Sequence, residues 1–206
     1  MKNLFQFFSC LLASLLPAAA EPASKTGGTP KRQATPAAAA KYLSESPLPQ
    51  GWPQPGPFGQ VARKKYPAYR AAFTAESSPN GGFWRLFKHI ERNQIPMTAP
   101  VEMKLDGSET ESAKMEEMAF LYQSQEVGKT GADGALVEVR DIPAREALSY
   151  AWQGRRTPAA TARARAAVDA ELARLNLKAA GYRLLGYNSP FVPGDRQTHE
   201  LQALLR

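Results

Sequence analysis

The sequence contains an internal repeat, and this repeat limits the folds that the chain can adopt. Residues 61–72 (VARKKYPAYRAA) match residues 137–148 (VEVRDIPAREAL) at a valine, a basic residue, an apolar-Pro-Ala step and a further alanine. Each copy precedes a helical pattern, then a proline-containing strand pattern (MTAPV or YNSPF), and then a second apolar strand. This order predicts two pseudo-symmetric βαββ units within one α+β domain.

The two helical patterns differ in the side chains that they carry. The first has an apolar stripe at three- and four-residue spacing, formed by Phe83, Leu86, Phe87 and Ile90. Trp84 flanks this stripe, and Asn80 is the expected N-cap. The second helix is predicted to start at Thr157-Pro158 and to reach Gly181, and it consists largely of alanine and arginine. A ligand pocket is therefore expected beside the first helix, which bears the large rings.

The N-terminal quarter of the chain reads as two segments outside the folded domain. Residues 1–20 have a lysine, a short apolar run and a small-residue site ending at Ala20, which predicts a cleaved signal peptide. The apolar run is short for a membrane anchor, which needs roughly 20 residues. Residues 21–57, rich in Ala and Pro, predict a disordered tether, and the folded domain is expected over 58–206. Export to a periplasm or the extracellular space follows, with no transmembrane span after cleavage.

Composition excludes several functions for the mature chain. The only cysteine, Cys10, lies in the predicted signal peptide, so the mature chain has no thiolate metal site and no cysteine nucleophile. The formal net charge of +7 is spread along the sequence without a Lys/Arg cluster, so no nucleic-acid surface is expected. No hydrolytic or nucleotide-binding motif is present, and no catalytic residue is predicted.

Four segments of the folded part together resemble the SOUL haem-binding protein family: YPAYRAAFT, FWRLFKHIERNQIPMTAPVEM, MAFLYQSQEVG and GYNSPFVPGDRQTHEL. The most specific feature is MTAPV followed much later by the Asn-x-Pro-aromatic motif at 188–191. The resemblance implies two βαββ units joined in one distorted antiparallel sheet or barrel, with two flanking helices. It also implies reversible binding of haem or another tetrapyrrole in an apolar groove, without catalysis by the domain itself.

The family's groove lies between the first helix and the loop that joins the last two strands. The resemblance places one wall of the groove at Phe83, Trp84, Phe87, Lys88 and Ile90. It places the other wall at Tyr187, Asn188, Pro190, Phe191 and Arg196, with Met97 and Met103 beneath the rings. Aromatic faces suit a flat macrocycle, and Lys88 or Arg196 would meet its propionates at the rim. The alternatives are that the apolar helix residues form ordinary core and that Arg196 is solvated.

Two histidines, His89 and His199, are the candidate axial ligands for a haem metal. The helical period places His89 about 110° from the centre of the apolar stripe, which predicts a solvated side chain. His199 alternates with Leu201 and Ala203, which predicts an inward side chain, and it stands where the family usually has asparagine. Many family members bind haem without an axial histidine, so neither residue is required.

Two other functions remain open at this point. The fold that the family implies is similar to effector-binding domains of the gyrase-inhibitor-like kind. An inward Glu200 would favour an effector-binding or hydrolytic domain for another apolar small molecule, whereas the default for this residue is an outward, solvated carboxylate. A shallow exposed apolar patch would instead favour an envelope module that binds peptides.

Overall fold

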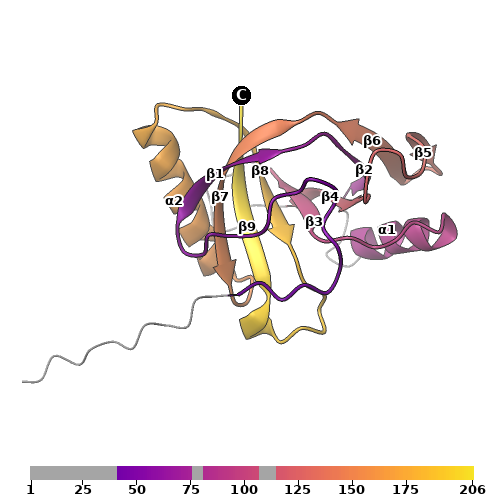
Figure 1. Cartoon of the computed structure of the whole chain (residues 1–206), viewed down its shortest axis with the longest axis horizontal. Coiled ribbons are helices and arrows are strands. Elements are labelled where there is room, and N and C mark those ends of the chain that lie inside the picture. Colours follow the sequence, from indigo (N-terminus) through magenta and orange to yellow (C-terminus); the bar gives the residue numbers. More distant parts are fainter. Residues whose placement is uncertain (1–40, 76–80, 107–114) are drawn as a thin grey trace, which may run out of the picture. The chain divides into compact units, whose positions relative to one another are not determined.

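The computed structural model describes residues 41–75, 81–106 and 115–206 (Figure 1). The predicted signal peptide, the first part of the expected tether and the predicted cap at Asn80 lie outside these ranges. The elements are β1 (Val61–Tyr66), β2 (Tyr69–Ala75), α1 (Gly81–Arg92), β3 (Val101–Leu105), β4 (Met115–Leu121), β5 (Gly131–Asp133), β6 (Val137–Ile142), β7 (Arg145–Gln153), α2 (Pro158–Arg174), β8 (Ala179–Gly186), the short 3₁₀ helix η1 (Gly194–Arg196) and β9 (Thr198–Leu205).

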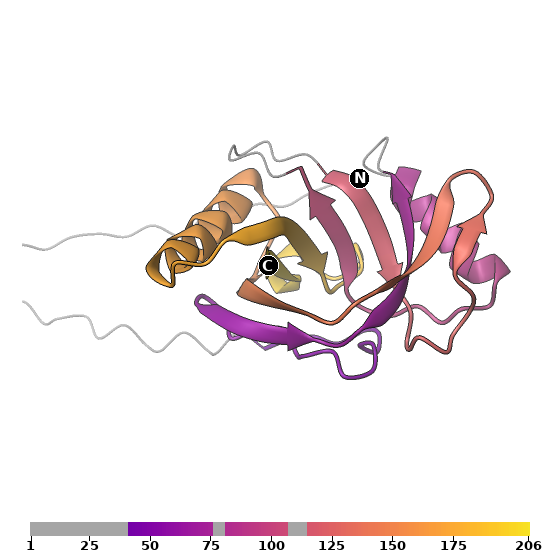
Figure 2. The ribbon, with the colours of Figure 1, turned by 90° about the horizontal axis from the view of Figure 1, so that it is seen from above.

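The strands form one antiparallel sheet in the order β1-β7-β9-β8-β3-β4-β2-β6-β5. The sheet curves strongly but stays open, with β1 and β5 at its two edges (Figure 2). The predicted α+β class with two flanking helices is therefore confirmed, and of the two arrangements expected, the open sheet is the one observed.

The strand order relates the two halves of the chain. Two strands precede each helix instead of the one expected, with β1 and β2 before α1 and β6 and β7 before α2. β1 pairs with β7, and β2 pairs with β6. The strands that directly follow the helices, β3 and β8, pair near the centre of the sheet. A pseudo-twofold relation between the halves stays a prediction.

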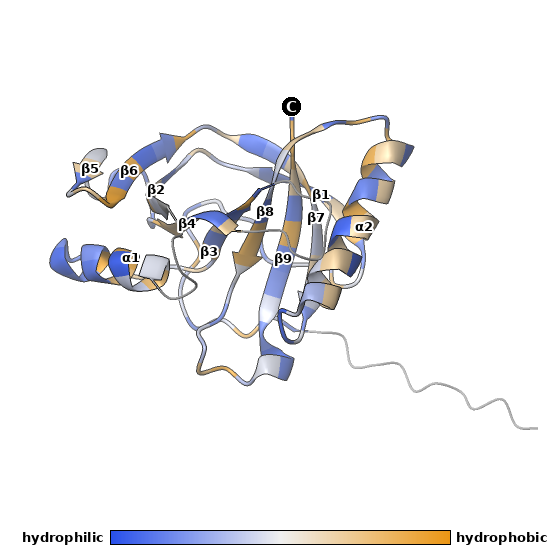
Figure 3. Cartoon of the chain, turned by 180° about the vertical axis from the view of Figure 1, so that it is seen from behind, coloured by the Kyte–Doolittle hydropathy of each residue, from blue (hydrophilic) through white to orange (hydrophobic). Residues whose placement is uncertain are grey.

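Both helices cover the same face of the sheet, which we call the helix face (Figure 3). α1 packs over β2, β4 and β6, whereas α2 packs over β7, β9 and β1. The apolar stripe of α1 explains its contact, since Leu86 and Ile90 are buried in the core. β8 and β3 lie between the two helices. None of the helices in the described ranges is long and apolar enough to cross a membrane.

The second helix begins as predicted but ends earlier. The hydroxyl of Thr157 accepts a hydrogen bond from the backbone N–H of Ala160 (3.1 Å), and proline occupies the first turn. The helix stops at Arg174 rather than Gly181, because Asn176 adopts a positive φ of 52° that a helix cannot continue through. The residues after it form β8 instead.

Residues 41–60, which we call the strap, run across the face opposite the helices (Figure 1). Its backbone is hydrogen-bonded to the domain, with Gln50 N–H donating to the Gln123 carbonyl (2.8 Å) and Gly59 N–H to the Ala151 carbonyl (2.9 Å). Trp52 is buried in a second core with Tyr66 and Tyr69. The expected tether therefore does not extend over 41–57, because one large buried ring outweighs a polar and proline-rich composition.

Candidate functional site

A row of residues crosses the helix face between α1 and α2, and we call it the cross-strand row. It is built by register: Trp152 of β7 lies opposite His199 of β9, which lies opposite Gly186 of β8. Gly186 in turn lies opposite Val101 of β3, and Val101 lies opposite Phe120 of β4. Directly opposed residues place their side chains on the same face of a sheet. The row therefore joins the α2 side of the face to the α1 side.

His199 is the titratable group in this row. Its side chain is 7% exposed, and neither ring nitrogen has a hydrogen-bond partner among the described residues. Burial, with a smaller contribution from the charge of Arg156, lowers the pKa of His199 to about 4. The ring is therefore neutral near pH 7, which is the protonation state in which imidazole ligates metals. The inward orientation expected for His199 is observed.

The surroundings of His199 include a glycine, a thioether and a guanidinium group. A Cβ atom built on Gly186 would lie 3.5 Å from the Met103 methyl carbon and 4.0 Å from Nδ1 of His199, and we call the position of this missing side chain the gap. Arg156, in the loop before α2, donates from Nη1 to the sulfur of Met103 (2.8 Å). The Trp152 ring lies beside the imidazole, with centroids 5.3 Å apart. A thioether, an imidazole and a guanidinium thus gather around one backbone gap.

His89 is placed differently from its prediction. Its side chain is only 4% exposed, so the expectation of a solvated histidine was wrong. Nδ1 donates to the Asp133 carboxylate, and Nε2 is hydrogen-bonded to the Tyr122 hydroxyl (2.6 Å). The hydrogen bonds from His89 and Arg92 lower the pKa of Asp133. Because both nitrogens are engaged in fixing α1 to β4 and β5, His89 is not available as a metal ligand in this arrangement.

The first predicted wall is divided between core and surface. Phe83, Trp84 and Phe87 form one aromatic cluster on α1, with centroid separations of 5.7–6.3 Å. Phe83 also contacts Phe120 edge-to-face (5.1 Å), which connects this cluster to the cross-strand row. Trp84, Phe87 and Lys88 are exposed, whereas Ile90 is buried. Met97, expected beneath the rings, is partly buried against the same core.

The second predicted wall lies elsewhere. Tyr187 is buried in the core beneath the strap, on the face opposite Phe83 and Ile90. Asn188 accepts from Thr198 N–H (2.8 Å) and donates to the Leu43 carbonyl (2.7 Å), so its amide shapes the loop and holds the strap. Pro190, Phe191 and Arg196 are exposed, Phe191 to 94%. The structure therefore separates Tyr187 from the first wall by the thickness of the sheet.

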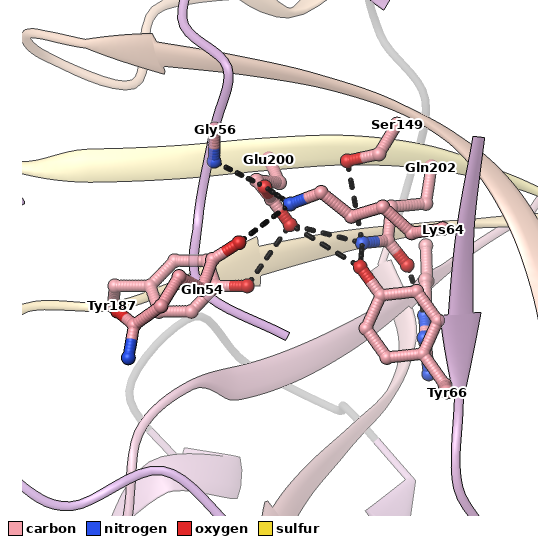
Figure 4. Close-up of polar contacts among 9 residues, drawn as sticks. Gln54, Gly56, Lys64, Tyr66, Ser149, Tyr187, Glu200 and Gln202 are labelled. Carbon is pink, nitrogen blue, oxygen red and sulfur yellow. Dashed lines mark hydrogen bonds and ion pairs between the residues drawn. The ribbon is translucent and has the colours of Figure 1, made fainter. Parts of the chain in front are cut away.

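A buried polar network occupies the face beneath the strap (Figure 4). Glu200 is fully buried and pairs with Lys64, which is itself buried. The same carboxylate accepts from Gly56 N–H (2.9 Å), from the Tyr187 hydroxyl (2.9 Å) and from Gln202 (3.0 Å). The default expectation of an outward, solvated Glu200 was wrong. Burial and the nearby carboxylate raise the pKa of Tyr187, which keeps this phenol a neutral donor.

The network continues to a second buried pair. Arg183, 1% exposed, donates to Glu102 (3.0 Å) and to the side-chain oxygen of Gln202 (2.8 Å). Tyr69 also donates to Glu102 (2.8 Å). Two cations and two carboxylates are therefore neutralised within one interior, as buried charges require.

A family model described as SOUL heme-binding protein matches residues 59–202. The chain belongs to the SOUL family. The match covers the sheet and both helices and leaves out nearly all of the strap. The family assignment expected from the sequence is confirmed.

Solved structures share the fold of this SOUL domain at low identity. The C-terminal domain of EcmrR is 13% identical, with a TM-score of 0.51, covering 71% of this chain and 97% of that one. A hydrolase from Listeria innocua is 8% identical, with a TM-score of 0.53, covering 72% and 93%. EcmrR in a complex with DNA is 14% identical, with a TM-score of 0.55, and the SOUL chain spans 57% of its length. A comparison with curated proteins gave no match.

The sequence did not indicate Trp152, Gly186 and Arg156 beside His199, because these residues become its neighbours only through strand register and loop geometry, which periodicity does not encode. It also did not indicate the partners of Glu200 in the buried network, including Lys64 and Gln202, or the neighbouring pair of Arg183 and Glu102. Only Lys64 had a usable signal, since alternation in β1 puts it on the same side as Tyr66, an inward position for a lysine.

Proposed function

We propose that this protein is an exported SOUL domain that reversibly binds haem or another tetrapyrrole on its helix face. The observation that carries the proposal is His199, a buried and neutral imidazole for which the described residues offer no hydrogen-bond partner at either nitrogen. Leaving such a group unsatisfied costs about 1–3 kcal/mol, which a coordinated metal would offset. Family membership supports the ligand class. Export rests on the sequence of residues 1–20 alone.

The residues present fit a haem group in three respects. When bound, haem supplies an iron that accepts a nitrogen ligand, and His199 offers one in the neutral form. Gly186 places no side chain of its own between a flat ligand and His199. Arg156 provides a cation beside the gap that could pair with a propionate, a role that the sequence had assigned to Lys88 or Arg196. Trp152, Met103 and the α1 rings supply apolar and polarizable surface.

The α1 aromatic cluster extends this proposed site. Phe83 contacts Phe120, which ends the cross-strand row that begins at Trp152. Exposed Trp84 and Phe87 would then cover the outer edge of a bound macrocycle, the role expected for the first wall. Asn188, Pro190, Phe191 and Arg196 enter the proposal only as the rim of the neighbouring loop, and Tyr187 is left to the opposite face.

A haemin titration of the purified protein tests this function. We expect a saturable, one-to-one change in the Soret band, and we expect His199→Ala to change the band position and weaken binding roughly tenfold or more, equivalent to about 1.4 kcal/mol. His89→Ala is the comparison, because its loss should lower stability without altering the Soret band of the folded complex. A featureless, non-saturable response of the folded protein would contradict haem binding.

Filling the gap at Gly186 should block the ligand without removing a donor. Gly186→Val is expected to abolish saturable haemin binding, because its branched side chain would occupy the space beside Met103 and His199. Gly181→Val, five residues earlier on the same strand, is the matched control, since a Cβ there meets no atom within 4 Å. Equal haemin binding by both variants, with unchanged circular dichroism, would place the ligand away from the gap.

The buried Glu200 favours a second candidate, the effector-binding or hydrolytic function on another small molecule. Its burial is the feature that this alternative required. However, its carboxylate already accepts hydrogen bonds from five donors, and Gly56 of the strap is one of them. An effector could reach Glu200 only by replacing the strap. Saturable binding of another apolar small molecule by the unaltered protein, without haemin binding, would favour this candidate.

A further inference from the structure

The strap is held to the sheet mainly through its backbone. Lys64 donates to the Gln54 carbonyl (2.9 Å), Gly56 N–H donates to Glu200 (2.9 Å), and Ala99 N–H donates to the Pro47 carbonyl (3.0 Å). Together with the bonds from Gln50 and Gly59, these contacts hold a proline-rich segment that turns at residues 49–52, where Trp52 N–H donates to the Pro49 carbonyl (3.0 Å). Proline restricts the backbone before binding, so such a segment has less conformational entropy to lose.

One strap side chain is the anchor. Trp52 packs edge-to-face against Tyr66 (4.7 Å between centroids) and Tyr69 (5.2 Å), and the guanidinium carbon of Arg183 lies 5.4 Å from its ring centre. A tryptophan in an aromatic slot over a cation is a typical peptide anchor. We call the space between Tyr66, Tyr69 and Arg183 the slot. The slot binds the Trp52 ring, and the adjacent Lys64–Glu200 pair binds the Gln54 carbonyl and the Gly56 N–H that follow it.

The face does not depend on the strap for charge neutrality. If the strap left, Lys64 would keep Glu200, and Arg183 would keep Glu102. Tyr187 and Gln202 would also remain on the Glu200 carboxylate. Opening the face therefore exposes no unpaired charge, in contrast to the usual penalty for disrupting a buried ion pair.

Two further features suit an exchangeable occupant. Gly56 and Gly59, at the junction of the strap with β1, have φ values of 106° and 73°, conformations that glycine adopts without strain. Nη2 of Arg183 is buried without a hydrogen-bond partner among the described residues, so the resident strap leaves one donor of the slot unused. A different peptide with an acceptor at this point would satisfy it.

We propose that this face is a peptide-binding site for a proline-rich segment that turns just before a tryptophan anchor, and that residues 47–57 are its resident, self-inhibiting occupant. A tethered segment has an effective concentration in the millimolar range, so an external peptide competes poorly until the strap is weakened. The site lies on the opposite face from the proposed haem site and does not depend on it.

The test is trans binding of a dye-labelled peptide with the sequence of residues 45–58, followed by fluorescence anisotropy. Trp52→Ala removes the resident anchor from the full chain, and we expect it to bind the peptide roughly a hundredfold more tightly than the unaltered protein does. A second variant, Gly56→Ala, keeps the ring in the chain but strains the junction at its positive φ. This variant should show a smaller increase in affinity for the peptide, so the test remains valid if Trp52→Ala fails to fold.

The control peptide has alanine in place of its tryptophan. We expect it not to bind either variant, and we expect haemin titrations of both variants to match that of the unaltered protein. No gain in peptide binding by either folded variant would overturn the proposal. Equal binding of the two peptides would overturn it as well, because the slot would then not select the anchor.

Discussion

Replacing Glu200 with alanine is expected to lower the free energy of unfolding by about 3–5 kcal/mol, the usual effect of removing one partner of a buried ion pair. Glu200 is fully buried, and its loss leaves the ammonium of Lys64 without a counter-charge in the interior. The Tyr187 hydroxyl and Gly56 N–H lose their acceptor at the same time. Urea unfolding followed by circular dichroism measures the change.

Two comparisons separate the ion pair from other causes. The double variant Lys64→Met with Glu200→Leu removes both charges, and it should recover most of the lost stability, because apolar replacements of a buried pair are often close to neutral. Glu146→Ala removes the partner of Arg63 in an ion pair at the surface, where little change is expected. If Glu200→Ala and Glu146→Ala had equally small effects, the network would not be a determinant of stability.

Acidification should destabilise the protein through His199. The pKa of this group is about 4 in the folded protein, below its ordinary value of 6.5. The unfolded state therefore binds more protons between these values, and stability is present above pH 6.5 and is lost as the pH falls toward 4. The loss should be about 2 kcal/mol between pH 7 and pH 5, and about 3 kcal/mol in full.

The variant His199→Leu isolates this contribution, because carboxylates also titrate in the acid range. It keeps an apolar group of similar size but removes the titration, so its stability should change less than that of the unaltered protein from pH 7 to pH 5. The difference between the two urea-unfolding series is the quantity to compare. Parallel pH profiles would show that His199 does not titrate below its usual range.

Local patterns of the sequence predicted much of the architecture. The stripe of α1 and the cap of α2 depend on neighbours three or four residues apart, and both were found where the residues indicated. The alternation of His199 with Leu201 and Ala203 likewise predicted its inward side chain correctly. These features depend on residues that are close in the chain, so they can be predicted from a single sequence.

The parts that were not predicted depend on long-range pairing. The strap was read as a tether from its Ala, Pro and Gln content, yet Trp52 gains its burial from Tyr66 and Tyr69 of the sheet. His89 was expected in solvent, but Asp133 and Tyr122, from distant segments, enclose it. Glu200 was misplaced for the same reason, since its partner Lys64 lies 136 residues away. Composition and periodicity carry no information on such partners.

The most direct test of the central claim, that His199 ligates a bound tetrapyrrole, is a nuclear magnetic resonance spectrum of histidine rings in the presence of gallium protoporphyrin. The chain has only two histidines, so ring labelling gives two sets of signals. If His199 ligates the metal, its signals shift strongly upfield on titration to one equivalent, while the His89 signals stay in place. A saturated complex in which the His199 signals do not move, or in which only those of His89 move, would contradict it.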